Sequence, residues 1–287
     1  MPKAAYYLTR PERRTTPVVF ASPHSGRDYQ WSFLRRTRLN EHSVRSSEDA
    51  FVDELFDCAP RYGAPFLKAA APRAYVDLNR ARDELDPALI EGARKTGHNP
   101  RVASGLGVIP RVVANGKAIY SGKITMAEAQ RRIDTYWAPY HETLRAQLDQ
   151  AHVMFGQAIL IDCHSMPHEA MDAVARSGVR RPEVVLGDRF GAAASERIVD
   201  RIEAAFAAAG LVVTRNTPFA GAYVTQHYGR PSNNVHAVQV EIDRALYMNE
   251  RLVRPNGNFA AFKRLLDGIV ADITDIGRAE ERPLAAE

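Results

Sequence analysis

Two histidines and an acidic pair lie where a chain often gathers side chains for chemistry. His24 follows the apolar segment 18–22, His164 lies near the end of the apolar run 157–165, and Glu48 and Asp49 lie between them in sequence. Two histidines and one carboxylate leave a coordination position open on a tetrahedral zinc ion, which is typical of catalytic sites. Spacing alone leaves an alternative, because histidines at strand ends also serve as hydrogen-bonding residues and no HExxH motif is present.

Two further carboxylates stand on apolar strands. Asp162 precedes His164 by two residues, so both side chains point to one face of a strand, where the carboxylate could orient or assist a metal site or form a strand-end hydrogen bond. Glu241 lies within VQVEI, where burial is costly unless the group is paired, protonated or functional. A buried salt bridge is the alternative for Glu241.

Alternating apolar strands and amphipathic helices must position these residues, and they predict an α/β domain with a central sheet flanked by helices over 1–287, with a core of about 17–276. The expected strands are 18–22, a pair at 65–71 and 74–80, 157–165, 183–187, 211–216 and 237–243. The expected helices are 48–59, two within 125–155 divided at Pro139, 195–208 and 258–275. The polar segment 80–100 is expected to be an exposed loop, and the segment 219–231 is expected to be a loop that forms a pocket wall.

Composition limits the possible partners. A net charge of +4 with scattered arginines favours a small anionic substrate and not a nucleic acid. No apolar run approaches the roughly 20 residues that span a bilayer, so no membrane partner is expected. Only two cysteines and no signal-like N-terminus predict a cytoplasmic protein, and nothing indicates an oligomeric state.

Six short motifs occur in an order that resembles the N-formylglutamate amidohydrolase family. They are PHSG at 23–26, DLNR at 77–80, YWAPYHETL at 136–144, DCHS at 162–165, GAYVTQHYG at 221–229 and VQVEI at 238–242. That family is similar in fold to zinc carboxypeptidases and aspartoacylases. The resemblance therefore implies a zinc-exopeptidase-like (phosphorylase/hydrolase-like) mixed sheet with a metal at the strand ends.

The resemblance also implies roles for individual residues. His24, His164 and Asp49 would hold one zinc ion, with Glu48 as the alternative to Asp49, and Glu241 would be the general base. From its place on the strand of His164, Asp162 is predicted to be a second catalytic residue. Asn79 and Arg80 would bind a substrate carboxylate through the planar guanidinium and the amide. Three residues of 221–229 would form a wall of the substrate pocket, although loop packing alone could explain them: Tyr223, Thr225 and His227.

The implied reaction is the zinc-dependent hydrolysis of N-formyl-L-glutamate to formate and L-glutamate, in histidine breakdown. Two departures keep alternatives open: the family has TDWH where residues 48–51 read EDAF, and Gln226 stands where an arginine is expected. A different N-acyl amino acid or a short peptide is the second enzymatic reading. A non-catalytic relative that binds carboxylates is the third.

Overall fold

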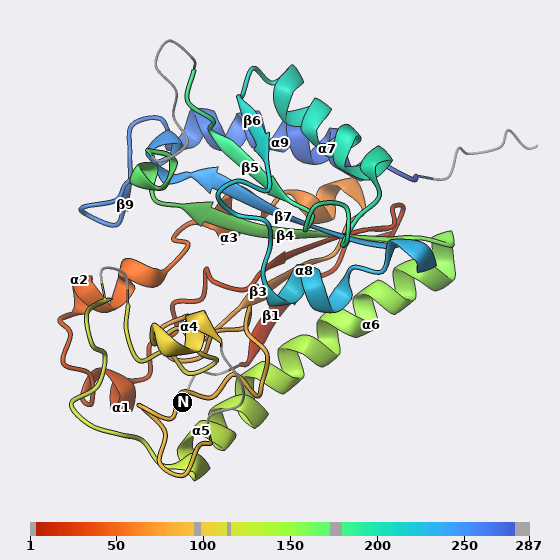
Figure 1. Ribbon diagram of the computed structural model, residues 1–287. Helices are drawn as coiled ribbons and strands as arrows, with labels where there is room; N and C mark the ends of the chain where they lie inside the picture. Colours follow the sequence, from red (N-terminus) through yellow and green to blue (C-terminus); the bar gives the residue numbers. More distant parts are fainter. Residues whose placement is uncertain (1–3, 95–98, 114–115, 173–179, 279–287) are drawn as a thin grey trace, which may run out of the picture.

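A mixed seven-stranded sheet forms the centre of the protein (Figure 1). The computed structural model describes residues 4–94, 99–113, 116–172 and 180–278. The strands are β1 (Tyr6–Thr9), β2 (Val18–Ser22), β3 (Phe66–Ala69), β4 (Ala158–Met166), β5 (Val184–Gly187), β6 (Val213–Arg215) and β7 (Val235–Asp243), with a separate pair β8 (Met248–Asn249) and β9 (Arg254–Pro255). The sheet order is β1-β3-β2-β4-β7-β5-β6. The four strands β3, β2, β4 and β7 are parallel, and β1 and β5 run antiparallel to their neighbours β3 and β7.

Helices cover both faces of this sheet. The α-helices are α1 (Trp31–Leu34), α2 (Glu41–Val44), α3 (Val52–Leu55), α4 (Pro100–Ala103), α5 (Met126–Arg132), α6 (Ala138–Phe155), α7 (Glu196–Ala208), α8 (Tyr223–Tyr228) and α9 (Phe259–Thr274). Single turns of other helix types are η1 (Arg45–Ser47), η2 (Ala59–Tyr62), η4 (Ile133–Trp137), η5 (His168–Met171), η6 (Pro231–Asn233) and η7 (Arg244–Leu246). No helix in the described part of the chain is long and apolar enough to cross a bilayer.

The two faces of the sheet carry separate apolar cores. Helices α3, α7 and α9 pack on one face, against residues such as Ile161 and Val240. Helices α6 and α8 pack on the other face, against residues such as Leu160 and Ala237 (Figure 1). The predicted α/β sandwich with a mixed sheet is therefore confirmed.

The second face changes from apolar to polar toward the carboxyl ends of β4 and β7. Since side chains alternate along a strand, Asp162 and His164 continue the row that begins at Leu160. Gln239 and Glu241 lie opposite them in register on β7. Four polar side chains thus share one patch of an otherwise apolar sheet.

The predicted strand at 74–80 is wrong. Residues 66–69 form β3, but the chain then turns, with the backbone N–H groups of Tyr75 and Val76 donating to the carbonyl of Pro72. The N–H of Asn79 donates to the side chain of Asp77 at 2.8 Å, a local bond that replaces a strand ladder. The apolar residues of this segment face the core, which is why their pattern imitates a strand.

The predicted helix at 48–59 is also wrong in extent, because only α3 is helical there before the turn η2. Phe51 has φ 68°, a left-handed backbone that stops any helix from starting at Glu48 or Asp49. The Asp49 side chain instead contacts His164 at 2.9 Å and Arg244 at 3.0 Å, and these tertiary contacts stabilise the non-helical form. Local propensity is overridden by the contacts of one carboxylate.

Three further expectations are corrected. The helical run 125–155 is interrupted by the π-turn η4 and continues as α6 with Pro139 in its first turn, where proline needs no helical partner. The expected loop 219–231 contains α8. Within 80–100, Asp86, Leu89 and Ile90 are buried, whereas 95–98 lie outside the described residues.

His141 ties α6 to the segment that carries Asn79. Its Nε2 donates to the carbonyl of Leu78 at 2.9 Å, and its Nδ1 lies 2.9 Å from the hydroxyl of Tyr228 on α8. Burial lowers the pKa of this imidazole to about 3, so the ring is neutral in the folded protein at ordinary pH.

Protonation of the unfolded chain makes this buried ring a source of acid sensitivity. Below pH 6.5, the ordinary pKa of histidine, His141 is protonated in the unfolded chain but stays neutral in the folded protein. The free energy of unfolding therefore falls as the pH falls toward 3. We expect the free energy of unfolding to lose about 1.4 kcal/mol per pH unit more in the wild type than in His141→Gln across pH 6 to 4.5. Urea unfolding over that range measures both slopes, and parallel slopes would contradict the prediction.

Candidate active site

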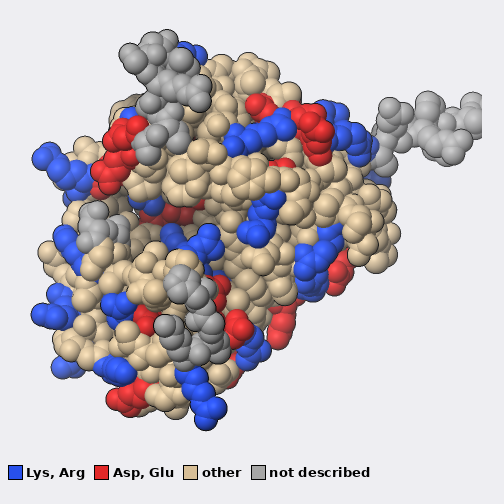
Figure 2. Space-filling view, viewed as in Figure 1, with Lys and Arg blue, Asp and Glu red and all other residues tan. Residues whose placement is uncertain are grey.

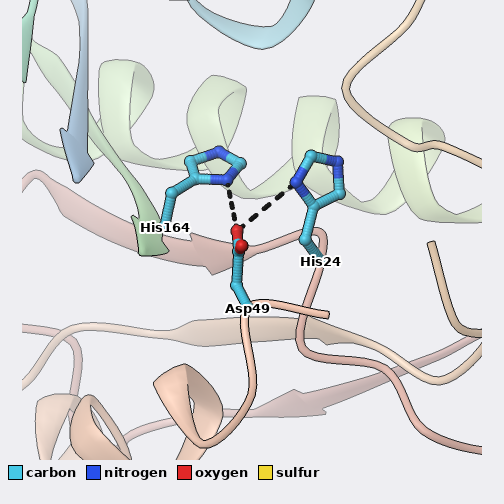
Figure 3. A group of neighbouring side chains, drawn as sticks. All are labelled: His24, Asp49 and His164. Carbon is cyan, nitrogen blue, oxygen red and sulfur yellow. Dashed lines mark hydrogen bonds and ion pairs between the residues drawn. The ribbon is translucent and has the colours of Figure 1, made fainter. Parts of the chain in front are cut away.

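Three side chains from three segments meet at the polar end of the second face. His24 comes from the loop after β2, Asp49 from the segment before α3, and His164 from β4 (Figure 3). Asp49 Oδ2 is 2.9 Å from His164 Nδ1 and 3.4 Å from His24 Nδ1. One possible ligand atom from each residue lies within 4.8 Å of the others, and all three residues are buried.

A second carboxylate stands behind each histidine. Asp77 Oδ1 is 2.7 Å from His24 Nε2, and Asp162 Oδ2 is 3.0 Å from His164 Nε2. Asp162 and His164 are close enough to form an ion pair, but the geometry of their contact is not that of a hydrogen bond. In metal sites a carboxylate on the outer nitrogen fixes the ring orientation and directs the other nitrogen at the ion. Both Nδ1 atoms are thus directed toward the same small volume.

Charge pairing sets the protonation of this cluster. Burial alone would raise the pKa of Asp49, but its hydrogen bond to His164 and the nearby imidazole of His24 hold that pKa well below its usual value. Asp77 behaves in the same way, because Arg73 and His24 outweigh burial and keep its pKa low. For His164, burial would lower the pKa, but the nearby Asp162 and Asp49 raise it well above the usual value.

The donor set fits a divalent cation. His24 Nδ1 is buried and has no hydrogen-bond partner among the described residues, which is costly for a buried polar atom. This nitrogen, His164 Nδ1 and a carboxylate oxygen form the two-histidine, one-carboxylate set that suits zinc with an open coordination position. The orphaned nitrogen gains a partner when such an ion binds.

Glu241 lies beside this cluster on β7, directly opposite His164 in register. Its Oε1 accepts a hydrogen bond of 2.8 Å from the side chain of Gln239. Burial raises the pKa of Glu241 to about 7, although the neighbouring His164 acts in the opposite direction. A carboxyl group with a pKa near neutrality can both accept and return a proton.

The cluster opens into a cavity of about 810 Å³ that is lined by both acidic and basic side chains. On the face shown in Figure 2, red and blue atoms meet in such a hollow. Among the described lining residues, three carboxylates are outnumbered by arginines, namely Arg73, Arg80, Arg101, Arg189 and Arg244. Two of these arginines neutralise the cluster itself, since Arg73 pairs with Asp77 and Arg244 pairs with Asp49.

Asn79 and Arg80 also line this cavity. Asn79 Nδ2 is 3.3 Å from His164 Nε2, and its Oδ1 accepts from the backbone N–H of Val224 at the start of α8. Arg80 donates from Nε to the carbonyl of Leu106 and from Nη1 to the carbonyl of Asn79. These bonds fix the guanidinium, and its role with a substrate carboxylate stays a prediction.

The remaining residues predicted for the site belong neither to the three-residue cluster nor to the described lining of the cavity. Glu48 accepts hydrogen bonds from Tyr29 and Arg45 and is not part of the three-residue cluster, which Asp49 joins instead. Three residues of α8 that were predicted to bind substrate are not among the described residues that line the cavity: Tyr223, Thr225 and His227. The Thr225 hydroxyl donates to the carbonyl of Ala222, and the His227 ring stacks on Tyr223.

Several residues of the site were not predicted from the sequence. Asp77 was within a quoted motif, and Gln239 precedes Glu241 by two residues, so period-two alternation along the strand could have found it. Arg73, Arg101 and Arg189 follow no local pattern. The fold alone brings these arginines to the cavity.

Comparison with known proteins agrees with this geometry. The family model described as N-formylglutamate amidohydrolase matches residues 16–248. An N-formylglutamate deformylase of Pseudomonas aeruginosa is 32% identical over 247 residues, covering 84% of this chain and 85% of that protein, and one of Pseudomonas putida is 30% identical, covering 82% of each.

A crystal structure extends the likeness to three dimensions. The N-formylglutamate amidohydrolase from Ralstonia eutropha JMP134 is 35% identical with a TM-score of 0.88, covering 95% of this chain and 98% of that one. The cluster, the cavity, the matched family model and these relatives lead to one conclusion: the chain belongs to the N-formylglutamate amidohydrolase family.

Proposed function

We propose that this protein is a zinc-dependent amidohydrolase that cleaves N-formyl-L-glutamate to formate and L-glutamate. The observation that carries the proposal is the pair of Nδ1 atoms directed at Asp49, on the floor of a cavity rich in arginine. The relatives named N-formylglutamate deformylase support the choice of substrate. A role in histidine breakdown and a cytoplasmic location remain predictions from the sequence.

His24, Asp49 and His164 are the residues that would hold the ion. Nitrogen and carboxylate oxygen donors in this number suit zinc, and carboxylates on the outer nitrogens hold both rings in place. When bound, zinc supplies a Lewis acid that polarises a carbonyl oxygen and makes water more acidic.

Glu241 is the general base of the proposed reaction. It takes a proton from the water that attacks the formyl carbon and returns it to the amide nitrogen as the C–N bond breaks, which releases formate and the free amine. Gln239 positions this carboxylate by a hydrogen bond to Oε1. Asp162 acts through His164, since it contacts only the outer nitrogen of that ring.

The arginines support an anionic substrate. Arg73 and Arg244 pair with Asp77 and Asp49, and the other three lining arginines outnumber the one remaining lining carboxylate, Glu241, so the described lining carries a net positive charge. A substrate with two carboxylates meets this charge, and Arg80 beside the cluster suits the carboxylate nearer the formyl group. Gln226, where an arginine was expected, is exposed on α8 and does not line the cavity.

Removing the carboxylate charge of the cluster is expected to weaken zinc binding. Asp49→Asn retains the size of the side chain but withdraws the charge, so we expect zinc affinity to fall at least about 10- to 100-fold. Glu48→Gln is the matched control, because Glu48 is occupied by Arg45 and Tyr29 and should leave zinc affinity unchanged. Competition with a chelating dye measures both, and loss of zinc in the control alone would assign the ligand to Glu48.

Glu241→Gln is expected to lower kcat about 10²- to 10⁴-fold while zinc content stays unchanged. The base must be ionised, so wild-type kcat/KM should fall as pH is lowered through the pKa of Glu241. Burial places that pKa at about 7, and a bound cation would lower it, so the acid limb belongs at or below pH 7. Stopped assays across pH 5 to 9 record the limb, and a full rate for the variant would remove Glu241 from the chemistry.

A substrate panel tests the reaction itself. Zinc-loaded protein should hydrolyse N-formyl-L-glutamate faster than N-formyl-L-aspartate, N-acetyl-L-aspartate and a blocked dipeptide, with formate and free amine as the measured products. Preference for another member of the panel would move the specificity and keep the hydrolase. Hydrolysis of none would favour a protein that binds carboxylates without cleaving them.

A further inference from the structure

Arg189 is the cavity arginine with the most constrained backbone. It follows β5 in the turn Arg189–Phe190–Gly191, in which all three residues have left-handed φ values of 56°, 56° and 85°. Side chains with a Cβ rarely adopt this conformation, and such residues cluster at binding sites, where the surrounding structure maintains them. The turn therefore gives Arg189 an unusual backbone conformation that the surrounding contacts must maintain.

A set of hydrogen bonds maintains this turn. The backbone N–H of Arg189 donates to the carbonyl of Ala220 at 2.8 Å, which joins the turn to the cavity wall. The Asn216 side-chain oxygen accepts from the N–H groups of Asp188 and Phe190. The stem of Arg189 lies over Gly221, where an added Cβ would come within 3.4 Å of its Cγ.

The guanidinium of Arg189 is left uncommitted by this arrangement. The neighbouring carboxylate of Asp188 is occupied, because its oxygens accept from the Gly191 N–H and the Asn216 amide. Within the described residues, no hydrogen bond or ion pair involves the Arg189 guanidinium, although the side chain lines the cavity. A half-buried arginine held at a cavity wall without an anionic partner has the properties of a ligand-binding residue.

The sheet order places Arg189 to one side of the reacting groups. His164 lies on β4, Glu241 lies on the next strand β7, and Arg189 leaves the strand beyond it, β5. Two strand spacings correspond to roughly 10 Å. Gly187, at the end of β5, pairs with Gln239 on β7, so an anion bound by Arg189 is displaced from the candidate metal cluster across the sheet toward the Gln239 end of the site.

We infer that Arg189 binds the side-chain carboxylate of the substrate and so selects an acidic N-acyl amino acid. The inference rests on the proposed function. The α-carboxylate sits on the carbon that bears the acylated nitrogen and must stay near the cluster, where Arg80 lies. The side-chain carboxylate ends a longer chain and reaches the more distant arginine. Arg101 is the other uncommitted lining arginine, but it is exposed on α4, where solvent weakens an ion pair.

The test compares N-formyl-L-glutamate with N-formyl-L-glutamine, which has the same shape without the side-chain charge. Wild-type kcat/KM should favour the glutamate compound by about 10- to 100-fold, the effect of one charged hydrogen-bonded pair. Arg189→Gln should reduce this preference to within about threefold by slowing only the glutamate compound. Arg189→Lys should recover part of the preference, because it restores the charge without the planar fork.

Two comparison variants and one outcome separate this role from a structural one. Arg201→Gln removes an exposed charge from α7 and should leave the preference intact. Arg101→Gln tests the other uncommitted arginine of the cavity, and loss of the preference in that variant but not in Arg189→Gln would overturn the inference. An Arg189→Gln variant that slows both compounds equally would likewise overturn it, since that outcome indicates damage to the fold.

Binding measurements keep the inference distinct from the proposed reaction. If the wild type cleaves neither compound, the proposed function fails, and calorimetric titration of both compounds still tests Arg189. Selective loss of N-formyl-L-glutamate binding in Arg189→Gln would support the inference even then. Equal wild-type affinity for the two compounds would refute it.

Discussion

Ionised side chains cannot be taken out of water without partners, and this constraint organises the whole site. The cluster buries Asp49, Asp77 and Asp162 around His24 and His164, and each charge is met by a neighbour of opposite charge or by a nitrogen donor. Breaking one such pair leaves its partner charged and buried, which is far more costly than losing an exposed ion pair. The surrounding loops must therefore meet these atoms in one arrangement.

The sheet supplies the fixed half of that arrangement. Parallel pairing of β4 with β7 sets Asp162 opposite Gln239 and His164 opposite Glu241, so strand register alone aligns the proposed base with the candidate ligand. Loops position the remaining groups of the site, and their backbones approach one another closely. A Cβ on Gly26, two residues after His24, would lie 2.2 Å from the carbonyl oxygen of Ala71. Only glycine permits this approach of two backbones beside the site.

Periodic patterns in the sequence predicted the buried strands and the long helices correctly, including β4 and β7 with their polar ends. They failed in two segments where side chains bond to the local backbone or to distant partners. The bond from Asn79 N–H to Asp77 converts an apparent strand into a turn, and the contacts of Asp49 prevent an expected helix. The histidines and Glu241 could be found because strand ends reveal them, whereas arginines such as Arg189 reach the cavity through tertiary structure alone.

The antiparallel strand β5 divides the site into parts that can change at different rates. The candidate ligands and Glu241 depend on β2, β4, β7 and the loops next to them, where a substitution disturbs the core on both faces of the sheet. Arg189 instead occupies a turn toward the edge of the sheet, supported mainly by Asn216 and the segment ending at Gly221. During evolution, this turn could acquire a new side chain while the hydrolytic groups stayed unaltered, so related proteins could diverge in the acids they recognise before they diverge in chemistry.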